Sequence, residues 1–128
     1  MKEVMAVIRM NMINKTKRAL AESGISSITV KDALGRGKGM VDFKVLKGAE
    51  LGYEEAIAQL GQSQRLIPKR LLTIIVPDEL VDSTVNTIIE TNQTGKSGDG
   101  KIFVLPCYDS LRVRTGESGD TVLDEGLH

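Results

Sequence analysis

The chain has 128 residues and a mass of 13.9 kDa, a length that fits a single domain. Hydrophobic residues make up 41% and charged residues 27% of the sequence, a composition that excludes a disordered or collagen-like chain. Seventeen Lys and Arg balance seventeen Asp and Glu, so no net positive field attracts nucleic acid or an anionic membrane. We therefore expect no nucleic-acid partner, and any anion-binding site must be local.

Cysteine content and the N-terminal segment indicate a cytoplasmic protein. Cys107 is the only cysteine, so it cannot form a disulfide within the chain and has no partner at metal-ligand spacing. The apolar run at residues 4–8 is too short for a signal-peptide core or a membrane span. We expect a cytoplasmic location, no membrane insertion and no metal centre built from cysteine.

The first half of the chain predicts two strands and a helix. Residues 2–9 form a mostly apolar run, typical of a central strand that is covered on both faces. An amphipathic helix is expected over about residues 15–23, followed by a second strand through residues 27–30. Glycines at residues 35–39 then begin a long loop, and the alternation at residues 41–45 predicts a short strand-like arm within it.

The second half repeats this order. Residues 71–76 form the densest apolar run and predict a buried third strand, and helical spacing predicts a helix over about residues 79–91. A glycine-rich loop at residues 94–101 leads into a fourth strand at residues 102–105. This βαββαβ order predicts an α+β, ferredoxin-like fold, an antiparallel sheet with both helices on one face.

Three segments have the composition of anion sites. The loop at residues 94–101 offers backbone amides with few Cβ atoms in the way, and Lys101 adds a charge. It is not a Walker motif, because Ile102 follows Lys101 and a strand follows the loop, and a plain glycine turn explains it equally well. Arg112 and Arg114, expected on one face of an extended segment, suit a polyphosphate, although surface arginines on an edge strand are the commoner case. Together with the basic glycine-rich segment 35–39, they favour an anionic small ligand.

No residue is assigned a catalytic role. The neighbouring carboxylates at residues 54–55 and 124–125 point to different sides of a helix or strand, which does not suit an acid–base pair. An RNA-recognition module is opposed by only two Phe, two Tyr and no Trp. A small nucleotide hydrolase is opposed by the lack of a base or a magnesium carboxylate beyond Asp99. The sequence does not indicate an enzyme.

The segment Thr94–Val104, followed by Arg112–Glu117, closely resembles the C-terminal signature of the PII nitrogen-regulatory proteins. Shorter similarities support this resemblance at residues 19–25, 48–50 and 75–78. The resemblance covers about residues 1–117 as one PII-like domain with a T-loop at about residues 36–68. Residues 118–128 remain as a C-terminal tail.

The resemblance implies a non-enzymatic sensor that assembles as a trimer, either of this chain alone or mixed with a PII paralogue. ATP or ADP would lie between neighbouring subunits, with 2-oxoglutarate beside the phosphates and Mg²⁺ as the ion that the family uses there. By motif position, the nucleotide would contact Thr29, Gly35, Gly37, Lys38, Ile75, Gly98, Asp99, Gly100, Lys101, Arg112 and Arg114. Lys69 and Gly39 would lie at the 2-oxoglutarate site.

Two departures from the family concern the T-loop. Lys38 is followed by Gly39 and Met40, where the family usually has a glutamine that helps to hold magnesium and 2-oxoglutarate. Leu51 stands where bacterial members carry a modified tyrosine. The longer T-loop resembles the longer member of the nitrogenase-associated PII pair. That branch implies regulation of nitrogenase through its dinitrogenase component, and the alternative is a general PII protein that controls an ammonium transporter or a nitrogen-assimilation enzyme.

Overall fold

A computed structural model describes residues 1–36 and 66–123 of the chain. Its strands and helices follow in the order β1 (Lys2–Arg9), α1 (Ile13–Glu22), β2 (Thr29–Gly35), β3 (Ile67–Val76), α4 (Val81–Asn92) and β4 (Lys101–Pro106). Short 3-10 turns lie at η1 (Met10–Met12), η3 (Asp78–Leu80) and η4 (Asp120–Val122). No helix in these ranges is long and apolar enough to cross a membrane.

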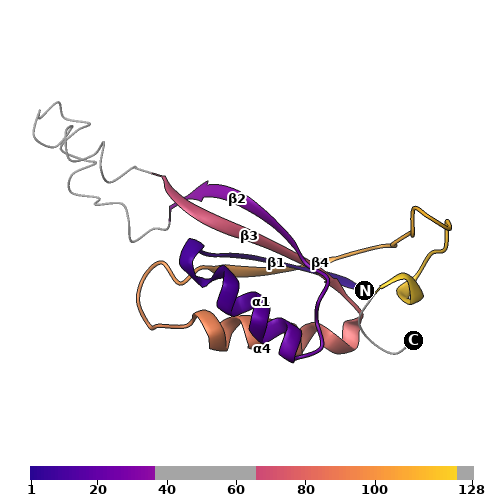
Figure 1. The fold of residues 1–128 in the computed structure, drawn as a ribbon, viewed down its shortest axis with the longest axis horizontal. Coiled ribbons are helices and arrows are strands. Elements are labelled where there is room, and N and C mark those ends of the chain that lie inside the picture. Colours follow the sequence, from indigo (N-terminus) through magenta and orange to yellow (C-terminus); the bar gives the residue numbers. More distant parts are fainter. Residues whose placement is uncertain (37–65, 124–128) are drawn as a thin grey trace, which may run out of the picture.

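The strands form one antiparallel sheet in the order β2-β3-β1-β4. Figure 1 shows α1 and α4 lying side by side against one face of this sheet. The sheet and the two helices confirm the predicted α+β, ferredoxin-like fold. β1 and β3 are the central strands, and the loop between α4 and β4 lies at one end of the sheet (Figure 1).

The core lies between the sheet and the helices. Val4, Ala6 and Ile8 alternate along β1 and are buried against the helical layer, as the two-residue period of a strand requires. Residues from β3 and both helices complete this cluster, namely Leu20, Ile25, Leu72, Ile74, Val76 and Ile88. On the opposite face of β1, Met5 and Val7 are only half-buried. The prediction of a central strand is therefore confirmed, but within the described residues only one of its faces is fully covered.

A buried polar contact joins the two helices. The side chain of Asn92 is 5% exposed, and its Nδ2 donates to Thr16 Oγ1 at 3.0 Å and to the Ile88 carbonyl at 2.9 Å. Thr16 Oγ1 in turn donates to the carbonyl of Met12 at 2.7 Å. Buried polar groups are costly unless they are paired, so this contact favours one position of α1 against α4. Asn92 ends α4, and the contact thereby fixes the point where the next loop begins.

The ends of the strands differ from the sequence prediction. β3 begins at Ile67 instead of residue 71, and β2 continues to Gly35 instead of ending at residue 30. Pro68 is tolerated because it pairs only with Leu34 of β2, since the pairing of β1 with β3 stops at Lys69. β2 and β3 therefore extend beyond β1 as a two-stranded ribbon. The T-loop expected at residues 36–68 overlaps β3 at its last two residues, and the arm predicted at residues 41–45 lies outside the described ranges.

Both helices are confirmed with small shifts. α1 begins at Ile13, two residues before the predicted start, because the 3-10 turn η1 leads directly into it and Ile13 packs against the core. α4 spans Val81–Asn92, and the first residues of the predicted helix form the 3-10 turn η3. These differences are of one turn or less, and they leave the arrangement of the layers unchanged.

The loop before β4 approaches β1 at Gly100. This residue has φ +114°, and a Cβ atom at this position would overlap the carbonyl oxygen of Val7. Only glycine fits, because another residue would suffer both a backbone strain and a backbone clash.

We expect Gly100→Ala to lower the free energy of unfolding by more than about 2 kcal/mol, since the clash is with backbone and cannot be relieved by a side-chain rotation. The matched control is Gly116→Ala. Gly116 has φ +75°, but a Cβ atom added there would meet nothing within 4 Å, so this variant should lose only about 1 kcal/mol. Urea unfolding followed by circular dichroism measures both values. Equal losses would contradict the close approach at Gly100.

Candidate anion-binding loop

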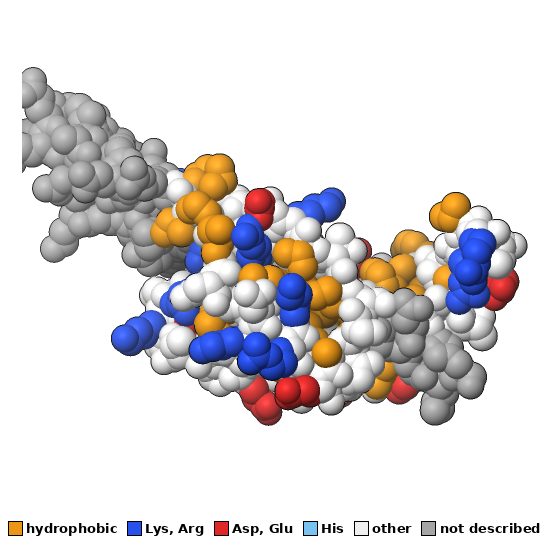
Figure 2. Space-filling view, in the orientation of Figure 1, with side chains coloured by type: hydrophobic (Ala, Val, Ile, Leu, Met, Phe, Trp, Pro, Cys, Tyr) orange, Lys and Arg blue, Asp and Glu red, His pale blue; other side chains and the backbone are white. Residues whose placement is uncertain are grey.

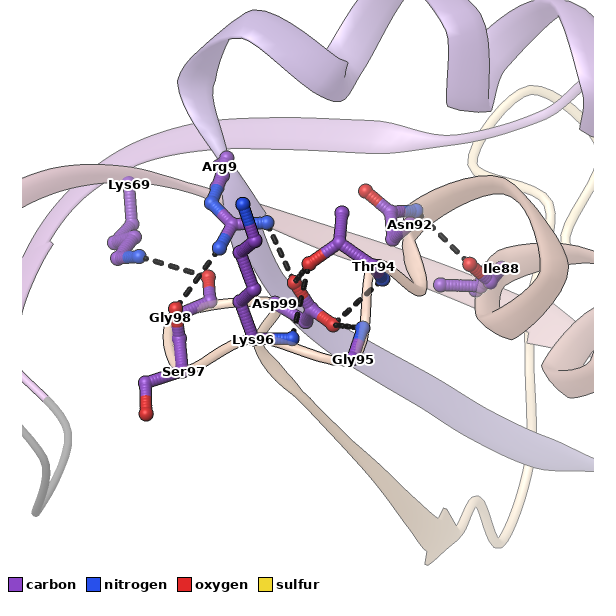
Figure 3. Close-up of polar contacts among 10 residues, drawn as sticks. All are labelled: Arg9, Lys69, Ile88, Asn92, Thr94, Gly95, Lys96, Ser97, Gly98 and Asp99. Atoms are coloured by element: carbon purple, nitrogen blue, oxygen red, sulfur yellow. Dashed lines mark hydrogen bonds and ion pairs between the residues drawn. The ribbon is translucent and has the colours of Figure 1, made fainter.

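The loop between α4 and β4 is organised around one carboxylate. Asp99 Oδ2 accepts the backbone N–H groups of Thr94 at 2.8 Å and Gly95 at 3.1 Å, and its Oδ1 accepts the Thr94 hydroxyl at 2.5 Å. Figure 3 shows these contacts converging on Asp99 from one side of the loop. The glycines Gly95 and Gly98 have positive φ values, which lets the chain turn back tightly towards the carboxylate.

Arg9 ties this loop to the end of β1. Its Nη1 lies 2.6 Å from Asp99 Oδ1, and its Nη2 donates to the Ser97 carbonyl at 2.9 Å (Figure 3). Hydrogen bonds from the Thr94 side chain and backbone, with a smaller contribution from Arg9, hold the pKa of Asp99 well below its usual range. Asp99 is therefore a carboxylate at neutral pH, and Arg9 compensates its charge.

Lys69 flanks the same loop from β3. Its Nζ donates to the Gly98 carbonyl at 3.2 Å, and Lys69 pairs directly with Arg9 in the register of β1 and β3. Two cations from neighbouring strands thus stand side by side at the loop. The sequence analysis does not include Arg9 in the site, because the position of Arg9 beside Lys69 depends on the register of β1 and β3. The one signal for Arg9 in the sequence is that it is a basic residue at the end of a predicted strand.

An anion could be held at this edge of the sheet. Arg9 neutralises Asp99, so the loop does not present a net negative charge, while the exposed Lys101 and the partly exposed Lys69 add positive charge. At Gly98 and Gly100 the space that a Cβ atom would occupy is taken by the Arg9 side chain and by the Val7 carbonyl, so these glycines let the loop pack closely against β1. In the described ranges, no group of three or more His, Cys, Asp or Glu residues is placed to hold a metal ion.

The other residues expected at the nucleotide are distributed over the sheet. Gly35 ends β2 opposite Ile67, at the same end of the sheet as Lys69. Thr29 and Ile75 lie towards the other end, where both line a pocket of about 410 Å³. Gly37, Lys38 and Gly39 lie outside the described ranges, so the structure says nothing about their expected roles.

Arg112 and Arg114 lie in a hairpin that follows β4. The extended segment predicted for them is wrong: the N–H groups of Thr115 and Gly116 both donate to the Arg112 carbonyl, and residues 113–115 form a turn. Arg112 pairs with Glu117 at 3.1 Å across the hairpin. The tight turn is favoured by Gly116, which has a positive φ.

The hairpin and the anion-binding loop lie at opposite ends of β4. This strand has six residues, which span roughly 20 Å. In Figure 1 the hairpin projects from the right of the molecule, and the loop lies at the left. Figure 2 shows basic side chains at both of these ends, with an acidic side chain beside those of the hairpin. One copy of the chain therefore does not bring the predicted nucleotide residues into a single site.

The lowered pKa of Asp99 predicts a specific pH dependence. Its ionised form is stabilised in the folded protein, so this contribution is fully present above the usual aspartate value of 3.8 and is lost as the pH falls below it. We expect Asp99→Asn to flatten the decline of stability below about pH 4. Thermal unfolding between pH 2 and 7 tests this, with Glu90→Gln, an exposed carboxylate of α4, as the matched control. An unchanged pH profile for Asp99→Asn would contradict the assigned network.

Comparison with known proteins gives matches over nearly the whole chain. The family model for nitrogen regulatory protein P-II matches residues 1–117. The "Nitrogen fixation nifHD region GlnB-like protein 2" of Methanobacterium ivanovii is 44% identical over 128 residues, covering 96% of this chain and 99% of the relative. The protein of the same name from Methanothermococcus thermolithotrophicus is 40% identical over 131 residues, with coverages of 96% and 98%.

A further relative comes from a bacterium. "Nitrogen regulatory protein P-II 1" of Escherichia coli is 38% identical over 123 residues, which cover 96% of this chain and 100% of the relative. The matched segment includes the loop organised by Asp99 and both arginines of the hairpin. The chain therefore belongs to the nitrogen regulatory protein P-II family and is similar to its nitrogen-fixation-associated branch.

Proposed function

We propose that the chain is a non-enzymatic regulator that binds ATP or ADP at the loop organised by Asp99. The observation that carries this proposal is the neutralised loop itself, in which Arg9 compensates Asp99 while Lys69 and Lys101 remain beside it. Gly98 and Gly100 let the loop pack against Arg9 and the Val7 carbonyl, which keeps the loop close to Lys69 and Lys101. These residues fit a phosphate chain.

The same edge suits 2-oxoglutarate, which carries two carboxylates. Lys69 Nζ donates one hydrogen bond to the Gly98 carbonyl and has further N–H groups for a carboxylate, whereas Arg9 is already engaged by Asp99 and the Ser97 carbonyl. The oxygens of Asp99 already accept hydrogen bonds from Thr94, Gly95 and Arg9, so they are poor candidates for Mg²⁺ ligands. A magnesium ion bound with the nucleotide would therefore take ligands other than Asp99.

The open face of the sheet supports an assembly of several copies. Phe103 is 46% exposed and lies opposite Met5, while Leu105 lies opposite Glu3 and also faces away from the helices. Exposed apolar side chains on a sheet face that no helix covers support an interface between subunits. We propose that in this assembly the arginine hairpin of one copy lies near the loop of another. We propose a trimer, of this chain alone or mixed with a PII paralogue.

Regulation would work by population shift. A ligand that binds one conformation of the protein more tightly than another shifts the equilibrium between the two conformations, and the size of the shift is set by the difference in affinity. A partner that binds only one of the conformations then binds more or less of the protein. The nif-region names of the archaeal relatives favour nitrogenase, through its dinitrogenase component, as the partner. The similarity to P-II 1 of Escherichia coli supports the alternative, an ammonium transporter or a nitrogen-assimilation enzyme.

We expect Arg112→Ala and Arg114→Ala each to weaken ATP binding by about 1.5–3 kcal/mol, the scale of a hydrogen bond to a charged group, while the fold survives. Isothermal titration calorimetry measures the affinities. Arg18→Ala, which removes an exposed arginine of α1, is the matched control and should bind ATP like the wild type. If both hairpin variants bind ATP with wild-type affinity, the hairpin has no part in the nucleotide site.

The partner is tested with purified dinitrogenase and the immobilised full-length protein. We expect 2-oxoglutarate with MgATP to change dinitrogenase affinity by about fivefold or more, and dinitrogenase to change 2-oxoglutarate affinity by the same factor, because the coupling is reciprocal. The Lys69→Ala variant should bind dinitrogenase without this response. Absence of any binding to dinitrogenase, with capture of a purified ammonium transporter instead, would favour the alternative partner.

A further inference from the structure

Basic side chains gather at the end of the molecule that carries the anion-binding loop. α1 follows β1 after the short turn η1, so its first residues lie at the same end of the sheet as Arg9 and the loop that Arg9 contacts. Figure 2 shows most of the Lys and Arg side chains outside the hairpin towards the left, on the side of this loop and the start of α1. We refer to the exposed cations of α1 and of the loop tip as the basic face: Lys15, Lys17, Arg18 and Lys96. Within residues 1–36 and 66–123, none of these side chains forms an ion pair.

The opposite end of the helical layer is acidic. η3 and the first turn of α4 contain Asp78, Glu79 and Asp82. Asp78 pairs with the N-terminal amine and lies close to the Lys2 ammonium group, whereas Glu79 and Asp82 are exposed and have no ion pair in the described part of the chain. The sequence has no net charge, but its positive and negative side chains are therefore separated along the molecule.

The cations of α1 lie where they destabilise the helix. The N-terminus of a helix carries a partial positive charge, so acidic side chains stabilise its first turn and basic side chains destabilise it. α4 follows this rule with Asp82, whereas α1 has no acidic residue in its first turn, has Lys15 there, and has no side chain that caps its N-terminus. Helix stability does not explain the position of Lys15. Attraction of an anionic partner does.

The other exposed positions of α1 indicate the class of this partner. They are Asn14, Ala21 and Glu22, which are short or polar. A helix that binds a membrane surface inserts large apolar side chains beside its cations, and α1 exposes none. Single-stranded nucleic acid is held by aromatic side chains as well as by cations, and neither α1 nor the loop contains an aromatic residue. An acidic protein surface needs only complementary charge at this position.

We propose that the basic face docks on an acidic surface of a partner protein. This inference rests on the proposed regulatory function, and it assigns partner contacts to residues outside the proposed nucleotide site. The cations of the basic face guide the encounter with the partner and strengthen the complex, although Lys15 destabilises α1 in the free protein.

The experiment uses the full-length protein with Lys15→Glu, and purified dinitrogenase as the probe. We expect this variant to bind dinitrogenase about tenfold more weakly at about 50 mM NaCl, mainly through a slower association, and to differ little from the wild type at about 500 mM NaCl. The same variant should unfold at a higher temperature than the wild type, because a carboxylate replaces an ammonium group in the first turn of α1. A loss of binding in a more stable protein cannot come from misfolding.

The matched control is the double variant Ala21→Glu/Ser83→Glu. It changes the net charge by the same amount as Lys15→Glu, at exposed positions towards the acidic end of the helical layer. This variant should bind dinitrogenase like the wild type, because its new charges lie away from the basic face.

Each other result would overturn a defined part of the proposal. Wild-type binding by Lys15→Glu, or an equal loss in the control variant, would overturn the basic face as the docking surface. Binding of the wild type to phosphatidylserine vesicles that Lys15→Glu abolishes would overturn the protein partner and assign the face to a membrane. A wild-type protein that binds ATP but not dinitrogenase would overturn the proposed partner, and the docking with it.

Discussion

The carboxylate of Asp99 is the constraint on which the candidate site depends. It accepts hydrogen bonds from Thr94 and Gly95 at the end of α4 and pairs with Arg9 at the end of β1. One side chain thus joins the helical layer to the sheet and closes the loop into a fixed turn. The hydrogen bonds from Thr94 keep Asp99 ionised, and the positive charge of Arg9 compensates the charge of this carboxylate. A negatively charged group can therefore approach the loop although the loop contains an acid.

Much of this architecture could be predicted from the sequence, because apolar periodicity and glycine positions are local signals. The apolar run at residues 4–8 predicts a central strand, and the loop at residues 94–101 is recognisable from its residues, whereas the fact that only one face of that strand is buried appears only in the structure. Arg9 could not be assigned, since its contact with Asp99 spans 90 positions of the chain and depends on strand register. The turn at residues 113–115 was missed because an alternating Arg-Val-Arg segment has the pattern of a strand, while the hydrogen bonds to the Arg112 carbonyl favour a turn.

The distribution of groups along β4 makes a single chain an incomplete receptor under the proposed function. The loop proposed to bind phosphates lies before this strand, whereas the arginine hairpin lies after it. An open apolar sheet face offers the surface through which another copy can supply the missing part. In the proposed assembly, such an arrangement would couple ligand binding to the contacts between subunits, and a regulator that reports its ligands to a partner needs a coupling of this kind.

The central claim is that Arg9, Lys69 and the loop closed by Asp99 form one joint site for a nucleotide and a dicarboxylate. Calorimetric titration of the wild-type protein with 2-oxoglutarate, in the presence and absence of saturating MgATP, tests this most directly. The account predicts saturable binding of 2-oxoglutarate that is at least about tenfold tighter with MgATP, because the dicarboxylate is proposed to lie beside the phosphates, where the Mg²⁺ bound to them would attract it. Equal affinity for 2-oxoglutarate with and without MgATP, or no binding of MgATP, would contradict it.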